Sequence, residues 1–239
     1  MNPKTPPSKD GPRTLAIDIG GTGLKMMVLD AAGTPLTDRD RERTPTPATP
    51  GAILHVLETQ MDRQPAFDRI SVGFPGVVVD GIVQTAPNLD EEWRGFPLAE
   101  TLQKQTDRET RVANDADVQG LGGIEGAGVE MVLTLGTGLG SALFIEGALV
   151  PNLELGHHPF HGNRTYEDYV SKAALEEIGK KRWRKRLLKV LAQVQPIWNP
   201  RKIFLGGGNA KLLKKEDLPK NVEICPNAAG ITGGIALWD

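Results

Sequence analysis

The sequence predicts an α/β fold of two lobes, and three observations lead to this expectation. The chain has 239 residues, which is enough for two lobes of about 110 residues each. Strand-like apolar segments alternate with helix-like segments along most of it. Two segments, Leu15–Leu29 and Val132–Ile145, share one design: a strand, a glycine-rich reversal and a second strand. Because Ile17–Gly20 aligns with Leu133–Gly136, each half of the chain is expected to begin with the same hairpin.

The N-terminal lobe is expected over residues 13–110, after a disordered tail at residues 1–12. Its elements are, in order, the hairpin of residues 15–29 with a turn at Asp30–Gly33, an exposed strand at 39–43, a helix at 52–61, a buried strand at 69–74 and a hairpin at 77–85. The last hairpin is predicted from the Asp80-Gly81 pair, a sequence that favours tight reversals between strands.

The C-terminal lobe is expected over residues 111–239. Its elements are, in order, a strand at 111–114, a short helix after Asp115, the hairpin of 132–145, helices at about 165–178 and 183–194, a strand at 202–205 and a small-residue terminal helix at 228–238. Thr165 and Asp168 form a capping-box pattern, and Pro196 is expected to end the helix before it. The terminal helix is expected to pack back on the N-terminal lobe.

Composition and charge narrow the class of protein. Hydrophobic residues make up 39% and charged residues 24%, which excludes a disordered chain and a membrane protein. The formal net charge of −2 suggests no nucleic-acid partner, although local basic patches stay open. The apolar-leaning run Met131–Ile145 is too short to span a bilayer. With no signal-peptide pattern and a single cysteine, Cys225, the chain is expected to be cytoplasmic, without a disulfide framework or a multi-cysteine zinc site.

Three glycine-rich loops each follow an apolar strand, and together they favour phosphate binding. They are Gly20–Gly23, Gly136–Gly140 and Gly206–Gly208. Glycine lets backbone N–H groups approach an anion without interference from a Cβ atom. One such loop alone is better explained as a tight turn, but three loops, two with a matching threonine, favour phosphate. The residues expected to contact phosphate are Gly20, Gly21, Thr22, Thr137, Gly138 and Gly207.

Two charged residues flank the first loop, and each allows two interpretations. Asp18 stands in an apolar strand, where a carboxylate must be solvated, paired or bound to a metal. A metal–phosphate role and a structural hydrogen bond to the loop explain it equally well. Lys25 stands across the hairpin, where it either meets phosphate or faces solvent. The motifs of P-loop, dinucleotide-binding, zinc-protease and serine-hydrolase proteins are absent.

Several motifs resemble the ROK sugar-kinase family, which has the two-lobed actin/hexokinase-like (ribonuclease H-like) fold. They are Asp18-Ile-Gly-Gly-Thr22, Asn114-Asp115, Leu135–Gly140 and Glu154-Leu-Gly-His157. Longer blocks resemble the family's polyphosphate glucokinase branch: Thr137–Phe160, Thr165–Tyr169, Gly179–Trp183 and Gly206–Lys211. The similarity covers about residues 13–239. The family usually carries a zinc-binding cysteine cluster, which a chain with one cysteine cannot form and which this branch typically lacks.

The resemblance implies phosphorylation of glucose at its 6-hydroxyl by inorganic polyphosphate, with ATP as a further donor, in a homodimer. It implies Mg²⁺ and no zinc, with the metal at Asp18 directly or indirectly. An ATP-dependent ROK hexokinase is the alternative enzyme. A non-catalytic sugar sensor is a third possibility, which the short segment before the first strand disfavours, because such sensors carry an N-terminal DNA-binding domain.

The same resemblance assigns roles to individual residues. It makes Asp115 the general base, and it implies sugar contacts for Asn88, Asn114, Asp115, Glu154, His157 and Glu167. From the residues alone, Asp115 is more simply the N-cap of the helix that follows it. In the same way, Glu154 is explained by loop packing and His157 by a surface position. If Asp115 is the base, Asp117 becomes the better candidate for the cap, or it is a surface group.

The run Lys180–Arg186 has six cations in seven residues. Such a run is normally a solvated helix face, but this one is wider than a single face. It is therefore predicted to contact a polyanion as a polyphosphate track, through Lys181, Arg184 and Lys185. Nucleic acid is the rival partner, and it is disfavoured because few aromatic residues lie between the cations.

Overall fold

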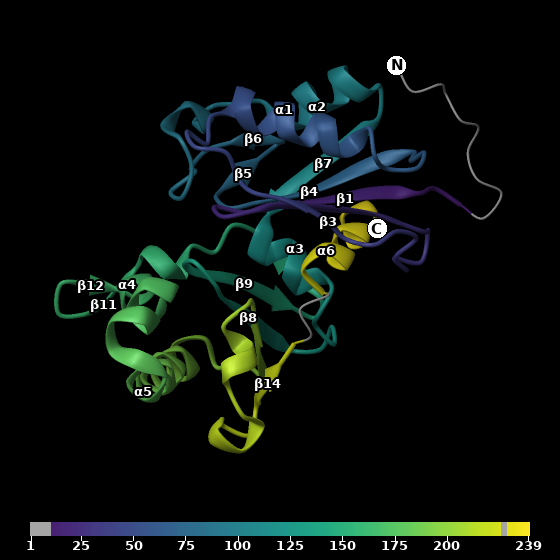
Figure 1. The fold of residues 1–239 in the computed structure, drawn as a ribbon. Coiled ribbons are helices and arrows are strands. Elements are labelled where there is room, and N and C mark those ends of the chain that lie inside the picture. The colour runs from purple at the N-terminus through teal and green to yellow at the C-terminus, as the bar shows by residue number, and fades with distance from the viewer. Residues whose placement is uncertain (1–10, 226–228) are drawn as a thin grey trace. The chain divides into compact units, whose positions relative to one another are not determined.

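The computed structural model describes residues 11–225 and 229–239, and it contains two five-stranded sheets of the same topology (Figure 1). The strand orders are β3-β2-β1-β4-β7 and β10-β9-β8-β13-β14. In each sheet an antiparallel hairpin continues into a third, short strand on one side, and two parallel strands follow on the other. The predicted repeat of hairpins is thus a repeat of whole sheets, and the two-lobed α/β fold is confirmed.

The chain forms two compact units and crosses between them twice. Unit 1 contains the described residues up to Gly122 together with Gly230–Asp239, and unit 2 is Gly123–Ala229. This division differs from the boundary expected at residue 111, because β7 pairs with β4 in the first sheet and α3 packs against both strands. The tail expected at residues 1–12 lies outside the described residues except for Gly11 and Pro12, and so does residue 228 of the terminal helix.

Unit 1 is built around the first sheet, with helices on both faces (Figure 1). Its elements are β1 (Thr14–Ile19), β2 (Leu24–Leu29), β3 (Asp40–Glu42), α1 (Pro50–Met61), β4 (Arg69–Phe74), β5 (Val78–Val79), β6 (Ile82–Val83), η1 (Glu91–Trp93), α2 (Leu98–Thr106), β7 (Glu109–Asn114), α3 (Asp115–Leu121) and, after the return from unit 2, α6 (Ala229–Thr232) and η5 (Gly233–Trp238). The core lies between β1, β2, β4 and the helices α1 and α2. Asp80 and Gly81 both have positive φ, 51° and 75°, which confirms the predicted reversal between β5 and β6.

The C-terminal segment of unit 1 packs on the sheet face opposite α1. Ser71 Oγ donates to the Gly234 carbonyl at 2.6 Å, and the Trp238 indole donates to Ser71 Oγ at 2.8 Å. The guanidinium groups of Arg69 and Arg111 each lie 4.5 Å from the Trp238 ring. Over its described residues the segment is a short α-helix followed by a 3-10 helix, in place of the single helix that the sequence predicts.

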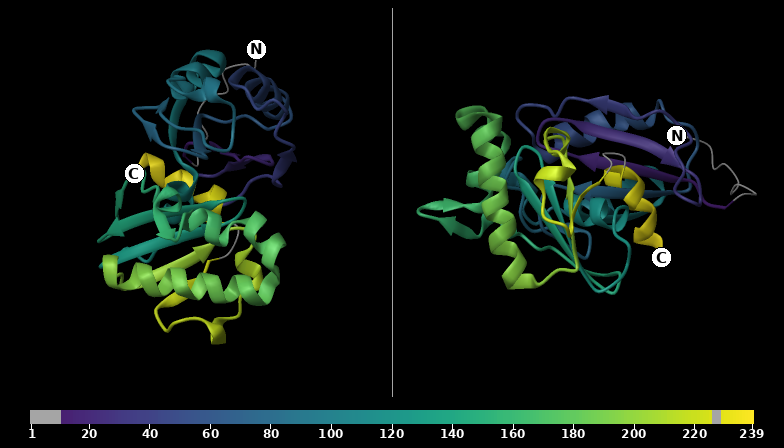
Figure 2. Two further views of the ribbon diagram at one scale, coloured as in Figure 1. Left: turned by 90° about the vertical axis from the view of Figure 1, so that its left-hand side faces the viewer. Right: turned by 90° about the horizontal axis from the view of Figure 1, so that it is seen from below.

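Unit 2 is built around the second sheet, and α5 lies along one face of it (Figure 2). Its elements are β8 (Val129–Leu135), β9 (Leu139–Ile145), β10 (Ala148–Val150), η2 (Leu155–His157), β11 (Pro159–His161), β12 (Arg164–Thr165), α4 (Tyr166–Val170), α5 (Lys172–Trp198), β13 (Lys202–Gly206), η3 (Ala210–Leu212), η4 (Lys215–Asp217) and β14 (Val222–Ile224). Trp183, Leu187 and Val194 of α5 pack on buried side chains of β8 and β13.

Two helix boundaries in unit 2 differ from the prediction. The capping box of Thr165 and Asp168 is present, but α4 ends at Val170, because Ser171 is extended and caps α5 by accepting from Ala174 N. Gly179 has non-helical angles (φ 75°, ψ 159°) and kinks α5 there. Pro196 does not end the helix, since it lies in the last turn, where a missing N–H removes a single backbone bond.

None of the described helices combines the length and the apolar character that crossing a bilayer requires.

Candidate active site

The first glycine loop connects β1 to β2 and lies against Asn88. Gly20 N donates to the Gly23 carbonyl at 3.1 Å, and Thr44 Oγ1 donates to the Gly20 carbonyl at 2.5 Å. A Cβ atom on Gly21 would stand 3.3 Å from Asn88 Cβ, which is tighter than an ordinary contact. Unit 1 therefore places a residue predicted to bind the sugar directly beside the loop predicted to bind phosphate.

Asp18 and Lys25 form an ion pair across the same hairpin. The two residues are opposite one another in the β1–β2 register, and Lys25 Nζ lies 2.5 Å from Asp18 Oδ2. Their side chains stay 20% and 30% exposed, respectively. An aspartate in an apolar strand must be solvated, paired or bound to a metal, and the structure shows Asp18 paired.

The donor set at Asp18 fits a magnesium ion that arrives on phosphate. Mg²⁺ is typically bound through one or two carboxylates and substrate phosphates, with several waters retained. Asp18 offers one partly exposed carboxylate at the mouth of the first loop. Within residues 11–225 and 229–239, no group of three or more His, Cys, Asp or Glu side chains could hold a metal on its own.

Asn114 is the N-cap of α3, a role that the sequence left between Asp115 and Asp117. Asn114 Oδ1 accepts from Ala116 N at 2.8 Å and from Asp117 N at 3.3 Å. Asn114 Nδ2 donates to the Gly76 carbonyl at 3.1 Å, and the residue is 5% exposed. The cap interpretation of Asp115 is therefore wrong, and so is that of Asp117, which is buried at 1% exposure.

The sheet register brings Asp18 and the start of α3 to the same edge of unit 1. Asp18 is opposite Gly73 on β4, and Gly73 is opposite Ala113 on β7, two residues before Asp115. A Cβ atom on Gly73 would lie 3.4 Å from Asp115 Cα, so Gly73 and Asp115 are close neighbours. The carboxyl ends of parallel strands are where open α/β sheets bind their ligands.

In unit 2, Glu154, His157 and Glu167 gather at the second glycine loop. His157 Nε2 lies 3.4 Å from Glu154 Oε2, and Glu167 Oε2 accepts from Leu139 N at 3.0 Å. A Cβ atom on Gly138 would stand 1.9 Å from that Glu167 oxygen. A larger residue at position 138 would have to displace the end of the Glu167 side chain, so Gly138 has a packing role beside its predicted contact with phosphate.

The carboxylate of Glu154 is partly withdrawn from water. Burial raises the pKa of Glu154, the charge of Glu167 raises it further, and His157 lowers it. Two carboxylates and an imidazole in one place can accept from and donate to the adjacent hydroxyl groups of a sugar. The arrangement suits the sugar contacts that the sequence analysis expects for these three residues.

Glu154→Gln is expected to have opposite effects on stability and on sugar binding. A raised folded pKa means that stability is lost as pH rises from the ordinary value of 4.5 through the folded value. The variant should therefore melt higher than the wild type at neutral pH, on the order of 2 °C, with no difference below about pH 4. Its KM for glucose should rise about tenfold, the effect of one lost charged hydrogen bond.

Melting curves between pH 4 and 8 and initial-rate kinetics check this expectation. His157→Ala is the companion variant, which should also raise the KM for glucose. Because His157 lowers the pKa of Glu154, its removal should raise that pKa further. An unchanged glucose KM in both variants would remove this loop from the sugar site.

The second and third glycine loops contact one another in unit 2. Asn209 N donates to the Leu135 carbonyl at 2.9 Å, and Asn209 Nδ2 donates to the Gly136 carbonyl at 3.3 Å. Gly207 has a φ of +80°, and a Cβ atom there would lie 2.5 Å from the Leu135 carbonyl oxygen. Thr137, Gly138 and Gly207 thus belong to one region. The sequence analysis did not identify Asn209 as the residue that links the second and third loops, although Asn209 directly follows the glycine run.

The basic run divides into anchored and exposed cations. Arg184 Nε donates to the Leu212 carbonyl at 3.0 Å, and its guanidinium lies 3.6 Å from Asp217. Arg186 lies 4.6 Å from the Tyr169 ring. Lys181 and Lys185 are exposed, and so are Lys180 and Arg182. Of the three predicted track residues, Arg184 therefore serves to hold a neighbouring segment.

The fold has two similar sheets, each opening with a glycine-rich hairpin, and Asp115 directly follows the parallel strand β7. These features define the class of the actin-like phosphotransferases. Residues 14–181 match the ROK family, and the chain belongs to that family.

Relatives that match over nearly the full length include kinases named for polyphosphate. Polyphosphate glucokinase of Mycobacterium tuberculosis (strain H37Rv) is 31% identical over 97% of this chain and 92% of its own. The inorganic polyphosphate/ATP-glucomannokinase of Arthrobacter sp. strain KM is 31% identical, with a TM-score of 0.85 over 96% of this chain and 100% of its own. A ROK glucokinase of Streptomyces griseus, solved with glucose and AMPPNP, shares the fold at 21% identity and a TM-score of 0.80 over 94% of this chain and 98% of its own.

Proposed function

We propose that this protein transfers a phosphoryl group from inorganic polyphosphate, or from ATP, to the 6-hydroxyl of glucose. The observation that carries the proposal is similarity over nearly the whole chain, in sequence and in fold, to kinases named for these donors and this sugar. The arrangement of polar groups at the loops of each unit supports it.

In this mechanism Asp115 is the general base. It takes the proton of the 6-hydroxyl while that oxygen attacks the terminal phosphorus of the donor and the bond to the bridging oxygen breaks. Asn114 supports this role, because its cap and its bond to Gly76 fix the first turn of α3. Mg²⁺ bound at Asp18 through the donor phosphates would offset the charge of the transferring group.

The sugar and the donor are held by separate groups of residues. Asn88 and Asn114 of unit 1 and Glu154, His157 and Glu167 of unit 2 contact the hydroxyls of glucose. The glycine loops hold the terminal phosphates through backbone N–H groups, with Thr22, Lys25 and Thr137 beside them. Water must also be kept from the bound donor, because it otherwise competes with the sugar as the acceptor.

A glucose 6-phosphate assay with polyphosphate and ATP in parallel tests the function. We expect phosphorylation of glucose with both donors and a higher kcat/KM with polyphosphate. Activity with ATP and none with polyphosphate would place the protein with the ATP-dependent ROK hexokinases. Binding of glucose without turnover by either donor would support the sugar-sensor alternative.

Two further expectations belong to this proposal. A homodimer follows from the resemblance to the family, and light scattering at several concentrations tests it. A cytoplasmic location agrees with the one cysteine, Cys225, which is a buried free thiol. Cell fractionation with an antibody to the native chain tests the location.

A further inference from the structure

Glu167 lies between the residues expected to bind the sugar and the second glycine loop, all within unit 2. It stands on the first turn of α4, which the capping box of Thr165 and Asp168 fixes. Its side chain is half-buried, and Glu167 Oε2 accepts from Leu139 N, inside the loop, at 3.0 Å. One side chain therefore belongs to both groups of residues.

The two oxygens of the Glu167 carboxylate have different surroundings. Among the residues that the structure describes, Leu139 N is the one hydrogen-bond donor to this carboxylate, and it contacts Oε2. Oε1 is therefore left for a ligand, and a carboxylate oxygen accepts well from a sugar hydroxyl. Because a carboxylate is planar and rigid, a hydroxyl bound at Oε1 also fixes the position of Oε2.

The carbonyl groups of the loop are held from another direction, by the start of α5. Lys172 N donates to the Gly136 carbonyl at 3.1 Å and to the Thr137 carbonyl at 3.3 Å. Ser171 N donates to the Glu167 carbonyl at 2.8 Å, which joins α4 to α5. The bond from Leu139 N goes to a side chain instead, so a sugar bound to that side chain can strengthen or release it.

Two glycines show how closely these segments pack. A Cβ atom on Gly138 would lie 1.9 Å from Glu167 Oε2 and 2.6 Å from Glu167 Cδ. A Cβ atom on Gly156, in η2, would lie 2.3 Å from the Leu139 carbonyl oxygen and 3.7 Å from Glu167 Cβ. The backbone at Leu139 is therefore held between Glu167 and the turn that carries His157, another expected sugar contact.

We propose that Glu167 is a positioning residue for the donor, because it sets the conformation of the second glycine loop and links that conformation to the bound sugar. The inference rests on the proposed function, since it gives a second role to an expected sugar contact. Glucose bound at Oε1 holds Oε2 on Leu139 N, and the ordered loop then presents its backbone N–H groups to the donor phosphates. Sugar and donor thus bind cooperatively, and each tightens the other by the same factor.

Calorimetry with inorganic triphosphate and 6-deoxyglucose tests the link without turnover, because this sugar lacks the hydroxyl that is phosphorylated. In the wild type, 6-deoxyglucose should lower the Kd of triphosphate about five- to tenfold. Glu167→Ala removes both contacts of the carboxylate. It should raise the Kd of triphosphate about tenfold in the absence of sugar, and 6-deoxyglucose should no longer change that Kd.

Glu167→Gln separates the two contacts. Its amide oxygen can still accept from Leu139 N, whereas its NH₂ group takes the place of the other carboxylate oxygen. The Kd of triphosphate without sugar should therefore stay within about twofold of the wild type, while the KM for glucose rises about tenfold. A residue that contacted the sugar alone would leave the Kd of triphosphate unchanged in both variants.

Gly138→Ala tests the same link from the loop. The added methyl group displaces the end of the Glu167 side chain, so the KM for glucose should rise about fivefold although no sugar contact is replaced. Gly136→Ala is the matched control for this KM. A Cβ atom on Gly136 meets no atom of the described residues within 4 Å beyond its chain neighbours, so the KM for glucose should not change.

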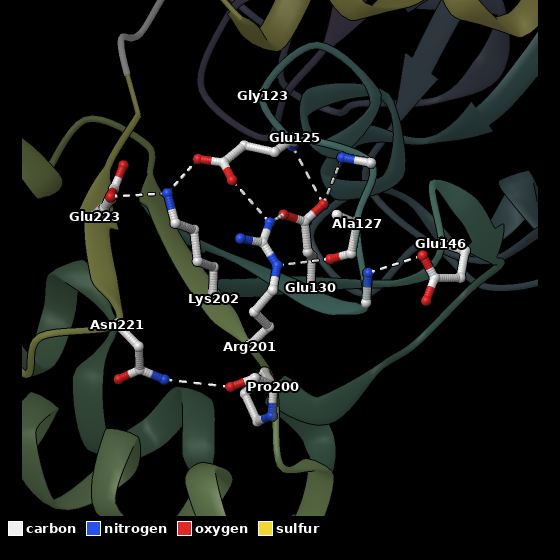
Figure 3. Close-up of polar contacts among 12 residues, drawn as sticks. Gly123, Glu125, Ala127, Glu130, Glu146, Pro200, Arg201, Lys202, Asn221 and Glu223 are labelled. Atoms are coloured by element: carbon white, nitrogen blue, oxygen red, sulfur yellow. Dashed lines mark hydrogen bonds and ion pairs between the residues drawn. The ribbon is translucent and has the colours of Figure 1, made fainter.

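A control for Glu167→Ala lies at the opposite end of the same hairpin, where Val129 is paired with Ile145. Glu146 Oε2 accepts from Gly128 N at 3.0 Å, so Glu146 is likewise a carboxylate bound to a backbone N–H group (Figure 3). Glu146→Ala should lower the melting temperature, as the loss of a hydrogen bond does, and leave the Kd of triphosphate and the KM for glucose unchanged.

Two results would overturn the proposal. One is a wild-type Kd for triphosphate in folded Glu167→Ala protein, which would make Glu167 a sugar contact alone. The other is a Kd for triphosphate that 6-deoxyglucose does not alter in the wild type. If Glu167→Ala does not fold, an unchanged KM for glucose in Gly138→Ala overturns the proposal instead. The donor assay tests the proposed function separately, so an active wild type that binds sugar and triphosphate independently refutes this inference alone.

Discussion

Asp115→Asn is expected to lower kcat by about 10²–10⁴-fold, the usual cost of losing a general base. The amide keeps the shape and the hydrogen-bonding capacity of the carboxylate but cannot take the proton of the sugar hydroxyl. Glucose affinity, measured by calorimetry, should therefore stay within about tenfold of the wild type. Rapid-quench kinetics with saturating glucose and either donor would measure the loss in the chemical step.

The N-cap of α3 makes this experiment specific. Since Asn114 and not Asp115 caps the helix, Asp115→Asn should leave the melting temperature nearly unchanged. Asn114→Ala is the contrasting variant, because it removes the cap and the bond to the Gly76 carbonyl. It should lower the free energy of unfolding by about 0.5–2 kcal/mol. A near-normal kcat in Asp115→Asn, with a loss of stability, would show that Asp115 is structural.

Much of the fold was predictable because its signals are local. The two glycine-rich hairpins, the Asp80-Gly81 turn and the boundaries of β4 follow from short stretches of sequence. The three-residue strand β14 was missed, since it exists only through parallel pairing with β13. The boundary between the units was misplaced for a related reason, because β7 belongs to unit 1 through its pairing with β4.

The residue types of the candidate site were predictable from the sequence, but the structural role of each residue was less so. Asn and Asp both cap helices well, and the backbone angle at Asn114 decides between the two neighbours. The pair of Asp18 with Lys25 follows from the hairpin register, which the sequence indicates without giving a distance. Which cations of the basic run are anchored depends on residues 212 and 217, which are remote in sequence.

The second large effect is expected at the exposed part of the basic run. A polyphosphate chain extends well beyond the three phosphates of ATP, so a long donor needs cations outside the catalytic groups. Lys181, Arg182 and Lys185 are exposed on α5 and are available for this contact. Replacing all three by Gln should raise the KM for long polyphosphate about tenfold or more. The KM values for ATP and glucose should barely change.

The salt dependence of KM separates a polyphosphate track from a solvated helix face. Binding of a polyanion releases counterions, so its logarithmic dependence on salt is set by the number of charges neutralised. Loss of three contacts should lower that slope by about 2. Arg184→Gln is the matched control on the same helix, since Arg184 holds Leu212 and Asp217. It should reduce stability and leave the slope nearly unchanged. If the KM of the triple variant rises equally for ATP and polyphosphate, α5 supports the fold. If the KM rises for neither donor, the cations only face solvent.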